Sequence, residues 1–318
     1  MTLTQPDSAP DSALDSAPDS VLEVSAVLQQ PVKRTAWTRF RRDRMALLGS
    51  AVLIVLIVGV LVGPLLYTAS YSDIDFTRAL QPPGSQYPLG TNDLGQDQLA
   101  RLLRGGRVSL AVGITAMLVS ISFGTVIGMV AGFCGGMIDN ALMRLTDLFL
   151  SLPQLPLLLL IIYLFRDSMR RVAGPELGVF VLIILVIGGL TWMSTARLVR
   201  AGFLATKERT FVQAARSLGA HPTRIVWRHI LPNVIGPVIV AATLGVGNAI
   251  ITESTLSFLG IGFPPDVPTW GRMLFDAQNY IASAPHLVIF PGLAIFLTVL
   301  SVNYVGDGLR DALDSRSR

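Results

Sequence analysis

Residues 45–72 read MALLGSAVLIVLIVGVLVGPLLYTASYS and contain no charged side chain. A helix needs about 20 consecutive apolar residues to cross a bilayer, because each residue adds about 1.5 Å and the hydrocarbon core is about 30 Å thick. The basic run just before this stretch, from Lys33 to Arg44, is typical of the cytoplasmic flank of a membrane helix. The stretch therefore predicts a first membrane span over residues 45–67.

The composition of the whole chain also indicates a membrane protein. Hydrophobic residues make up 51% of the 318 residues and charged residues 14%, whereas soluble domains carry about 25% charged residues. A soluble domain of this size needs a polar surface that so few charges do not provide. The composition argues against a soluble enzyme, a disordered protein and a nucleic-acid binder.

Five further apolar stretches satisfy the same length criterion. We expect spans near residues 108–132, 142–165, 177–198, 233–256 and 285–306. Each span must be helical, because lipid cannot satisfy the backbone hydrogen-bonding groups of an open strand. The sequence thus predicts an all-α membrane protein with six transmembrane helices and both termini on the same side.

The distribution of basic residues predicts the orientation of these spans. With the N-terminus inside, seventeen Lys and Arg residues fall in cytoplasmic segments and eight fall in outer loops. Cytoplasmic loops ordinarily carry the excess of basic residues. We therefore expect cytoplasmic termini, although Arg166, Arg170 and Arg171 lie in an outer loop against this rule.

Composition divides the chain into four parts. Residues 1–30 repeat a DSAP/DSAL pattern with few apolar groups, which predicts a disordered acidic cytoplasmic tail. Residues 31–44 form a basic juxtamembrane segment, residues 45–312 the transmembrane domain, and residues 313–318 a short C-terminal tail.

The sequence contains no pattern typical of a catalytic or metal site. Its single cysteine, Cys134, excludes an intramolecular disulfide and a cysteine-cluster metal site. The three histidines lack His-Glu-x-x-His spacing, and the chain has no G-x-x-x-x-G-K-[ST] loop for ATP. We therefore expect a chain that is not an enzyme and binds no cofactor or metal of its own.

The most informative segment outside the spans is KERTFVQAARSLGAHPTRIVWRHILPN, residues 207–233. A first short helix is predicted by an apolar stripe at i, i+3, i+4 and i+7, formed by Phe211, Ala214, Ala215 and Leu218. Gly219 then stands where a helix end favours a left-handed residue. Pro222 fits the first position of a second short helix near residues 222–231, and Pro232 marks the passage into the next span.

Two interpretations of this loop are open on physical grounds. The second helix interleaves Arg224 and Arg228 with apolar residues, which suits docking into a groove of a cytoplasmic partner. The same pattern suits a helix that lies in the headgroup layer of the membrane.

The loop over residues 207–232 resembles the E-A-A-x3-G-x9-I-x-L-P signature of ABC importer permeases. The matching residues are Gln213, Ala214, Ala215, Gly219, Leu231 and Pro232. Gln213 stands where that family has Glu, and His229 where it has Ile. In that family this loop is the coupling helix that inserts into the ATPase subunit, so the resemblance implies ATPase coupling through these residues, Arg224 and Arg228.

Two outer segments are similar to the C-type permeases of dipeptide, oligopeptide and nickel importers. Residues 87–113 read YPLGTNDLGQDQLARLLRGGRVSLAVG and resemble that family's H-P-L-G-T-D-x-x-G-R-D segment. Residues 253–274 read ESTLSFLGIGFPPDVPTWGRML and resemble its outer segment after the fifth span. The resemblance implies the type I ABC importer permease fold and an outer face that receives a substrate-binding protein. Candidates for an outer gate or for contact with that protein are Asp93, Asp97, Glu253 and Trp270.

On physical grounds the outer segments form either such a platform or a re-entrant plug that seals the bundle. Asn92 or Asp93 can cap a short helix over residues 94–104, and Gly105-Gly106 would stop that helix.

Small and charged residues in the spans also have two interpretations. Small residues four apart in the second span allow close helix packing, within this chain or against a second permease, and include Gly124, Gly128 and Gly132. Arg144 and Asp147 can pair at i and i+3 in the third span. We expect structural roles for this pair and for Glu253, because they lie near the membrane interface.

The resemblance implies a permease subunit of an ATP-driven importer for di- or oligopeptides in the bacterial plasma (inner) membrane. The implied partners are a second permease, two subunits that bind ATP and Mg, an extracytoplasmic substrate-binding protein and the lipid bilayer, but no nucleic acid. Nickel or glutathione is the alternative cargo. An ion-driven secondary transporter would need inverted repeats and ionisable residues at the midplane, and the sequence shows neither. A membrane enzyme would need an acid–base pair or metal-ligand spacing, which the sequence also lacks.

Overall fold

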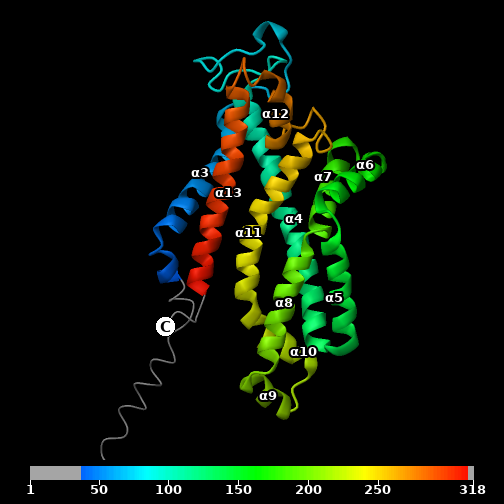
Figure 1. Cartoon of the computed structure of the whole chain (residues 1–318). Coiled ribbons are helices and arrows are strands. Elements are labelled where there is room, and N and C mark those ends of the chain that lie inside the picture. The colour runs from blue at the N-terminus through cyan, green and yellow to red at the C-terminus, as the bar shows by residue number, and fades with distance from the viewer. Residues whose placement is uncertain (1–36, 314–318) are drawn as a thin grey trace, which may run out of the picture.

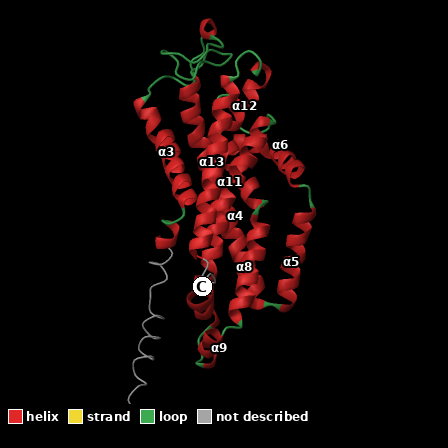
Figure 2. Ribbon diagram, turned by 60° about the vertical axis from the view of Figure 1, so that its left-hand side comes forward, coloured by secondary structure: helices red, strands yellow, loops and turns green. Residues whose placement is uncertain are grey.

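The computed structural model describes residues 37–313, which form an elongated bundle of α-helices without strands (Figures 1 and 2). The predicted tail over residues 1–30 lies outside the described residues, as does nearly all of the tail over 313–318. The longer helices are α3 (Arg44–Leu66), α4 (Gln98–Cys134), α5 (Gly136–Ser151), α6 (Gln154–Ala173), α7 (Pro175–Gly189), α8 (Trp192–Lys207), α11 (Leu231–Phe258) and α13 (His286–Leu313). The shorter elements are a 3₁₀ turn (Phe76–Arg78), α9 (Thr210–Ser217), α10 (Pro222–Arg224), a π-helical turn (Ile225–Ile230), α12 (Trp270–Ala277) and a second 3₁₀ turn (Gln278–Tyr280).

Four helices within the described residues are long and apolar enough to cross a membrane. They are α3, α4, α13 and the continuous helix Pro222–Phe258, which contains α11. Two bent pairs, α5 with α6 and α7 with α8, bring the number of spans to six if each pair is one span. The start of α3 and the end of α13 lie at the same end of the bundle (Figure 1).

The predicted third span over residues 142–165 is not one straight helix. The helix is interrupted between Ser151 and Gln154, and the axes of α5 and α6 form an angle of 87°. Pro153 causes this break, because a proline disfavours the helical conformation of the residue before it, and Leu152 is extended with ψ 138°.

The predicted fourth span over residues 177–198 is also divided, with a milder bend of 41° between α7 and α8. Gly188 and Gly189 weaken the helix just before the bend. The Thr191 hydroxyl donates to the Ile187 carbonyl over 2.8 Å, a bond to the preceding turn that often accompanies a bent helix.

Helix α4 lies at the centre of the bundle and packs most extensively along α8. Gly124, Gly128 and Gly132 provide this close approach within the chain. A Cβ atom at Gly124 would lie 2.6 Å from the Trp192 carbonyl oxygen, and one at Gly132 would lie 2.6 Å from Cβ of Phe203. Larger side chains would therefore push α4 and α8 apart.

Loops and short helices gather at the two ends of the bundle (Figure 1). We call one the α12 end, which comprises residues 67–97 and 259–285 together with the adjoining ends of α4 and α11, and the other the α9 end, which comprises residues 208–230. Helix α4 runs from the α12 end towards the α9 end and so connects the two.

The predicted pair of Arg144 and Asp147 is replaced by a different ion pair. Asp147 binds Arg197 of α8 instead of the arginine on its own helix. Both side chains are more than half exposed, so this pair stabilises the chain little.

Candidate functional site

At the α9 end, the prediction of a left-handed residue after the first short helix is confirmed. Gly219 has φ +76°. Its N–H donates to the Arg216 carbonyl over 3.0 Å, and the N–H of Ala220 donates to the Ala215 carbonyl over 3.1 Å. These two bonds form a Schellman motif, which satisfies carbonyls at the end of α9 and turns the chain sharply.

The predicted apolar stripe of α9 faces away from the bundle. Leu218 is 88% exposed and Phe211 is 44% exposed, whereas Val212 is completely buried. Gln213 and Ala214 are exposed and Ala215 is half-buried. The helix therefore attaches to the bundle through Val212 and presents the predicted coupling residues outward.

The predicted second short helix is not separate from the fifth span. Pro222 begins a helix that continues through the π-helical turn to Phe258. Pro232 has no N–H to donate to the turn before it, which explains the local change of hydrogen bonding. The N–H of Leu231 donates to the Val226 carbonyl five residues earlier, and Nδ2 of Asn233 donates to the His229 carbonyl over 2.6 Å.

Exposed basic and aromatic side chains continue the surface onto this helix. Arg224 and Arg228 are exposed and four residues apart, so they lie on one side of the helix. Trp227 between them is 62% exposed. Leu231 is half-buried and Pro232 exposed. We define the α9 surface as Phe211, Gln213, Ala214, Ala215, Leu218, Gly219, Arg224, Trp227 and Arg228.

A buried apolar cluster fixes the α9 surface to the membrane helices. It joins α9, the π-helical turn, α8 and the start of α11 through Val199, Phe203, Val212, Ile225, Val226, Ile230, Val234 and Val238. The elements that carry the α9 surface are therefore in direct apolar contact with two membrane helices.

At the α12 end, the predicted short helix over residues 94–104 is instead the first part of α4. Helix α4 begins at Gln98 and passes through Gly105-Gly106 without a break. These glycines allow another segment to approach: a Cβ at Gly105 would lie 3.2 Å from Cα of Thr269, and one at Gly106 would lie 2.8 Å from the Trp270 ring.

Asp97, not Asn92 or Asp93, is the cap of this helix. Its Oδ1 accepts the N–H of Ala100 over 2.9 Å, and its Oδ2 accepts the Tyr67 hydroxyl. Asn92 shapes the preceding turn, because its Oδ1 accepts the N–H of Leu94 over 3.1 Å. Asp97 thus joins the start of α4 to the residue that follows α3.

Glu253 and Trp270 belong to one buried hydrogen-bond network. Glu253 is completely buried and accepts the hydroxyls of Ser109 over 3.1 Å and Ser257 over 2.8 Å. The Ser109 hydroxyl oxygen accepts the N–H of Trp270 over 3.2 Å, and Nε1 of Trp270 donates to the Leu102 carbonyl over 3.1 Å. The network fastens the start of α12 to α4 and α11.

A charged cavity of about 500 Å³ lies at the same end of the bundle. Arg101, only 3% exposed, binds Asp276 over 3.3 Å, and Arg272 binds the same carboxylate over 2.9 Å. Burial raises the pKa of Asp276, although both guanidinium groups oppose the shift. Asp93 also lines the cavity.

The four predicted gate or contact residues thus differ in their surroundings. Asp97, Glu253 and Trp270 are buried within the chain, and Asp93 alone of the four is partly exposed and lines the cavity. Sequence reasoning missed the cluster of Arg101, Arg272 and Asp276, because Arg101 and Asp276 are 175 residues apart and no local pattern relates them.

Comparisons with known proteins agree with this architecture. Residues 124–318 match the family described as the binding-protein-dependent transport system inner membrane component. Residues 33–83 match the N-terminal transmembrane domain of oligopeptide transport permease C.

The chain belongs to this permease family. It is therefore a multi-pass inner-membrane component of a binding-protein-dependent ABC transporter, and it is a transport subunit without a catalytic role. Membership also implies that it works with ATPase and substrate-binding-protein partners.

Several relatives match nearly the whole permease. The dipeptide transport system permease protein DppC of Alkalihalophilus pseudofirmus is 36% identical over 285 residues, 90% of each chain. The glutathione transport system permease protein GsiD of Pectobacterium atrosepticum is 37% identical over 284 residues, which are 89% of this chain and 91% of that protein. The oligopeptide transport system permease protein OppC of Bacillus subtilis is 35% identical over 286 residues, 90% of each chain.

A solved structure shares the fold. It is an inward-facing conformation of the MetNI methionine ABC transporter, with a TM-score of 0.54 and 17% sequence identity. The match covers 67% of this permease and 96% of that chain. The type of fold predicted from the sequence is thereby confirmed, and at this identity the likeness concerns the fold alone.

Proposed function

We propose that this permease forms a translocation path for di- or oligopeptides together with a second permease, and that two ATPase subunits drive it through the α9 surface. In this proposal the α9 end and both termini are cytoplasmic. The α12 end faces outward and receives the substrate-binding protein.

The observation that carries the proposal is the arrangement of the α9 surface. Its apolar and basic side chains are exposed, although a buried apolar cluster holds the helices that carry them in place. A rigid, exposed amphipathic surface suits a groove in a protein partner. The family membership of the chain makes an ATPase the partner that we propose.

The same arrangement explains how ATPase movement would reach the spans. Val212 of α9 packs in one cluster with Phe203 of α8 and Val234 of α11. A partner that moves α9 would therefore move the ends of α8 and α11 together. Such a coupled shift is what opening a path alternately to the two sides requires.

The cargo is proposed from the relatives. Proteins named for dipeptide and oligopeptide transport match about nine-tenths of this chain. A relative named for glutathione transport matches equally well, and glutathione is itself a small peptide. A short peptide is therefore the cargo class that all three relatives share.

The coupling assignment is tested by two matched substitutions at exposed apolar positions. Leu218 in the α9 surface is 88% exposed, and Met137 at the start of α5 is 87% exposed. Because neither side chain packs in the chain, Leu218→Asp and Met137→Asp should both leave the permease folded and in the membrane. We expect Leu218→Asp to reduce co-purification of the ATPases at least tenfold and Met137→Asp to leave it unchanged.

Equal co-purification by the two variants would show that the α9 surface is not the ATPase site. In that case, the interpretation of α9 as a headgroup-layer helix replaces it.

Cargo and orientation need separate measurements. Proteoliposomes that contain the complete transporter should take up labelled dialanine only with ATP and the binding protein. Reporter fusions within residues 205–230 should report cytoplasm, and those within 75–100 and 262–280 should report the outside. ATP-independent uptake would contradict the proposed energy source, and reversed reporters would contradict the orientation.

A further inference from the structure

Most hydroxyl groups in the middle of α11 are satisfied within the helix itself. Thr243, Thr252 and Thr255 each donate to the carbonyl four residues earlier, over 2.8 to 3.0 Å. Thr298 of α13 does the same over 2.7 Å. These threonines therefore need no hydrogen-bond partner outside their own helix.

Asn248 of α11 is different. Its side chain is exposed, and its carboxamide has no hydrogen-bond partner within the described residues. It lies seventeen residues after Leu231 and ten before Phe258, which places it roughly 25 Å and roughly 15 Å from the two ends of the helix. A carboxamide with two donors and an acceptor is poorly placed at this depth if it faces hydrocarbon.

A second carboxamide, on the neighbouring helix, lies near Gly247, the residue before Asn248. Oδ1 of Asn303, on α13, lies 3.9 Å from the position that a Cβ of Gly247 would occupy. Asn303 is partly exposed, and its side chain also lacks a hydrogen-bond partner in the part of the chain that the structure describes. Two unsatisfied amides therefore lie at nearly the same depth, one on α11 and one on α13.

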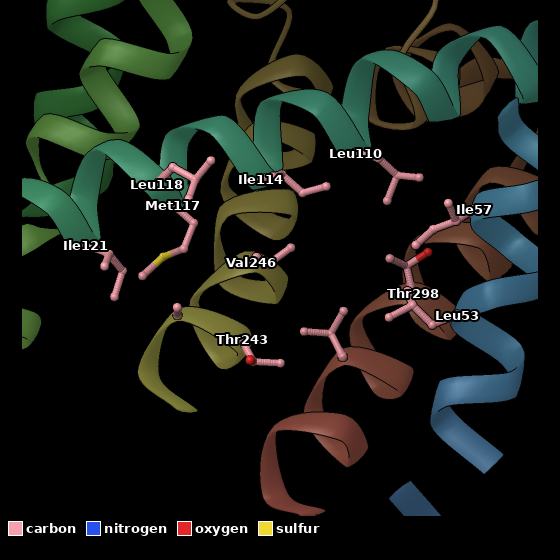
Figure 3. Close-up of a pocket in the computed structure, with 12 residues that line it drawn as sticks. Leu53, Ile57, Leu110, Ile114, Met117, Leu118, Ile121, Thr243, Val246 and Thr298 are labelled. Atoms are coloured by element: carbon pink, nitrogen blue, oxygen red, sulfur yellow. The ribbon is translucent and has the colours of Figure 1, made fainter. Parts of the chain in front are cut away.

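The opposite side of α11 is apolar. A pocket of about 280 Å³ lies there between α3, α4, α11 and α13 (Figure 3). Val246 and Thr243 line it from α11, and its other lining residues are apolar apart from Thr298. At about 100° per residue, Asn248 is turned about 200° from Val246 and about 140° from Thr243. Helix α11 thus has an apolar side, suited to lipid, and a different side that carries Asn248.

We infer that Asn248, with Asn303 at nearly the same depth on α13, lines the aqueous translocation path and binds the main chain of the passing peptide. A carboxamide can donate to a peptide carbonyl and accept from a peptide N–H, so it recognises any peptide irrespective of its side chains. Polar residues inside membrane helices commonly mark such pathways. The peptide part of this inference rests on the proposed function, whereas the location of the path does not.

Thiol accessibility tests the location. In a Cys134→Ser background, Asn248→Cys is compared with Leu118→Cys, because Leu118 is 60% exposed and lines the apolar pocket. Leu118 and Asn248 lie at the same depth along the bundle to within about one helical turn, because Met117 of α4 lies against Gly245 of α11. In vesicles that contain the complete transporter, a charged methanethiosulfonate should modify Asn248→Cys at least tenfold faster than Leu118→Cys. Equal or reversed rates would overturn the path assignment.

Dialanine tests the contact with peptide. Dialanine at a millimolar concentration should slow modification of Asn248→Cys at least threefold and leave modification of Leu118→Cys unaffected.

Uptake by substituted permeases provides a second test. At matched membrane levels, Asn248→Leu should lose at least tenfold in dialanine uptake with unchanged ATPase co-purification. Asn248→Gln should retain at least a third of the parent uptake. Parent uptake of dialanine without any protection of Asn248→Cys would overturn the peptide contact. A parent that takes up no dialanine, but has a water-accessible Asn248→Cys, would contradict the proposed cargo and leave the path assignment standing.

Discussion

At the α12 end, several charged and polar side chains are buried and bonded to one another, whereas at the α9 end the basic side chains are exposed above a small apolar cluster. Arg101 and Glu253 illustrate the first case, with exposures of 3% and 0%. Arg224 and Arg228 illustrate the second. The α12 end holds several irregular segments together, and buried hydrogen bonds give those segments one arrangement. The α9 end has only short helices to hold, so its polar groups stay available to a partner.

The largest effect should follow from removing the carboxylate shared by two arginines at the α12 end. Asp276→Ala leaves Arg101 and Arg272 without their common partner. The two arginine side chains are only 4% and 13% exposed, and breaking a buried ion pair from one side costs up to about 3–5 kcal/mol. The thermal unfolding midpoint of the purified transporter should fall clearly.

An exposed pair at the same end provides the control. Asp75 binds Arg78, and both side chains are about a third to a half exposed. Exposed ion pairs stabilise a protein little, so Asp75→Ala should hardly shift the unfolding midpoint. Equal losses for the two variants would mean that the burial of the arginines does not distinguish the two ion pairs.

A smaller effect is expected at the hydrogen-bond network of Glu253. Glu253→Ala deprives the hydroxyls of Ser109 and Ser257 of their acceptor. We expect a total loss of about 1–3 kcal/mol, because each hydroxyl can rotate towards a carbonyl of its own helix. Glu253→Gln keeps one carbonyl oxygen and should lose about half as much. Membrane abundance and thermal unfolding would measure both, and a Gln variant as unstable as the Ala variant would show that the network needs the charge as well as the shape.

At the α9 end, a comparable change should affect coupling more than stability. Gly219 has a left-handed backbone, and a Cβ there would meet no atom within 4 Å. Gly219→Val should therefore cost about 1–2 kcal/mol through the backbone alone, and should turn the helix that carries Arg224 and Arg228. We expect normal membrane levels with reduced ATPase co-purification or uptake, and a milder loss for Gly219→Ala. Parent-like transport by Gly219→Val would refute the coupling interpretation of residues 207–232.

The smallest effect is expected outside both ends. Deletion of residues 2–30 should leave uptake unchanged, because the family matches begin at residue 33 and the deleted segment is rich in Asp, Ser and Pro. Uptake by cells at matched membrane abundance would measure this. Lost uptake with normal abundance would reveal a partner of the acidic segment.

The sequence by itself determined the features that depend on neighbouring residues. Uninterrupted apolar stretches located the helices, and the glycine and proline that follow α9 located its end and the next helix start. Gly219 and Pro222 act through their own backbone geometry, so no distant contact was needed to predict them. The resemblance of residues 207–233 to a permease signature was readable for the same reason.

Tertiary structure alone decided which distant partners several charged and small residues meet. Gly105-Gly106 looked like a helix stop, but the segment at Thr269 and Trp270 packs against these glycines and α4 continues. Asp147 forms an ion pair with Arg197 on another helix, and Arg101 forms one with Asp276, 175 residues further along the chain. A charge or a small residue suits many partners, and only the packing of the helices selects one, because the contact joins residues that no local pattern relates.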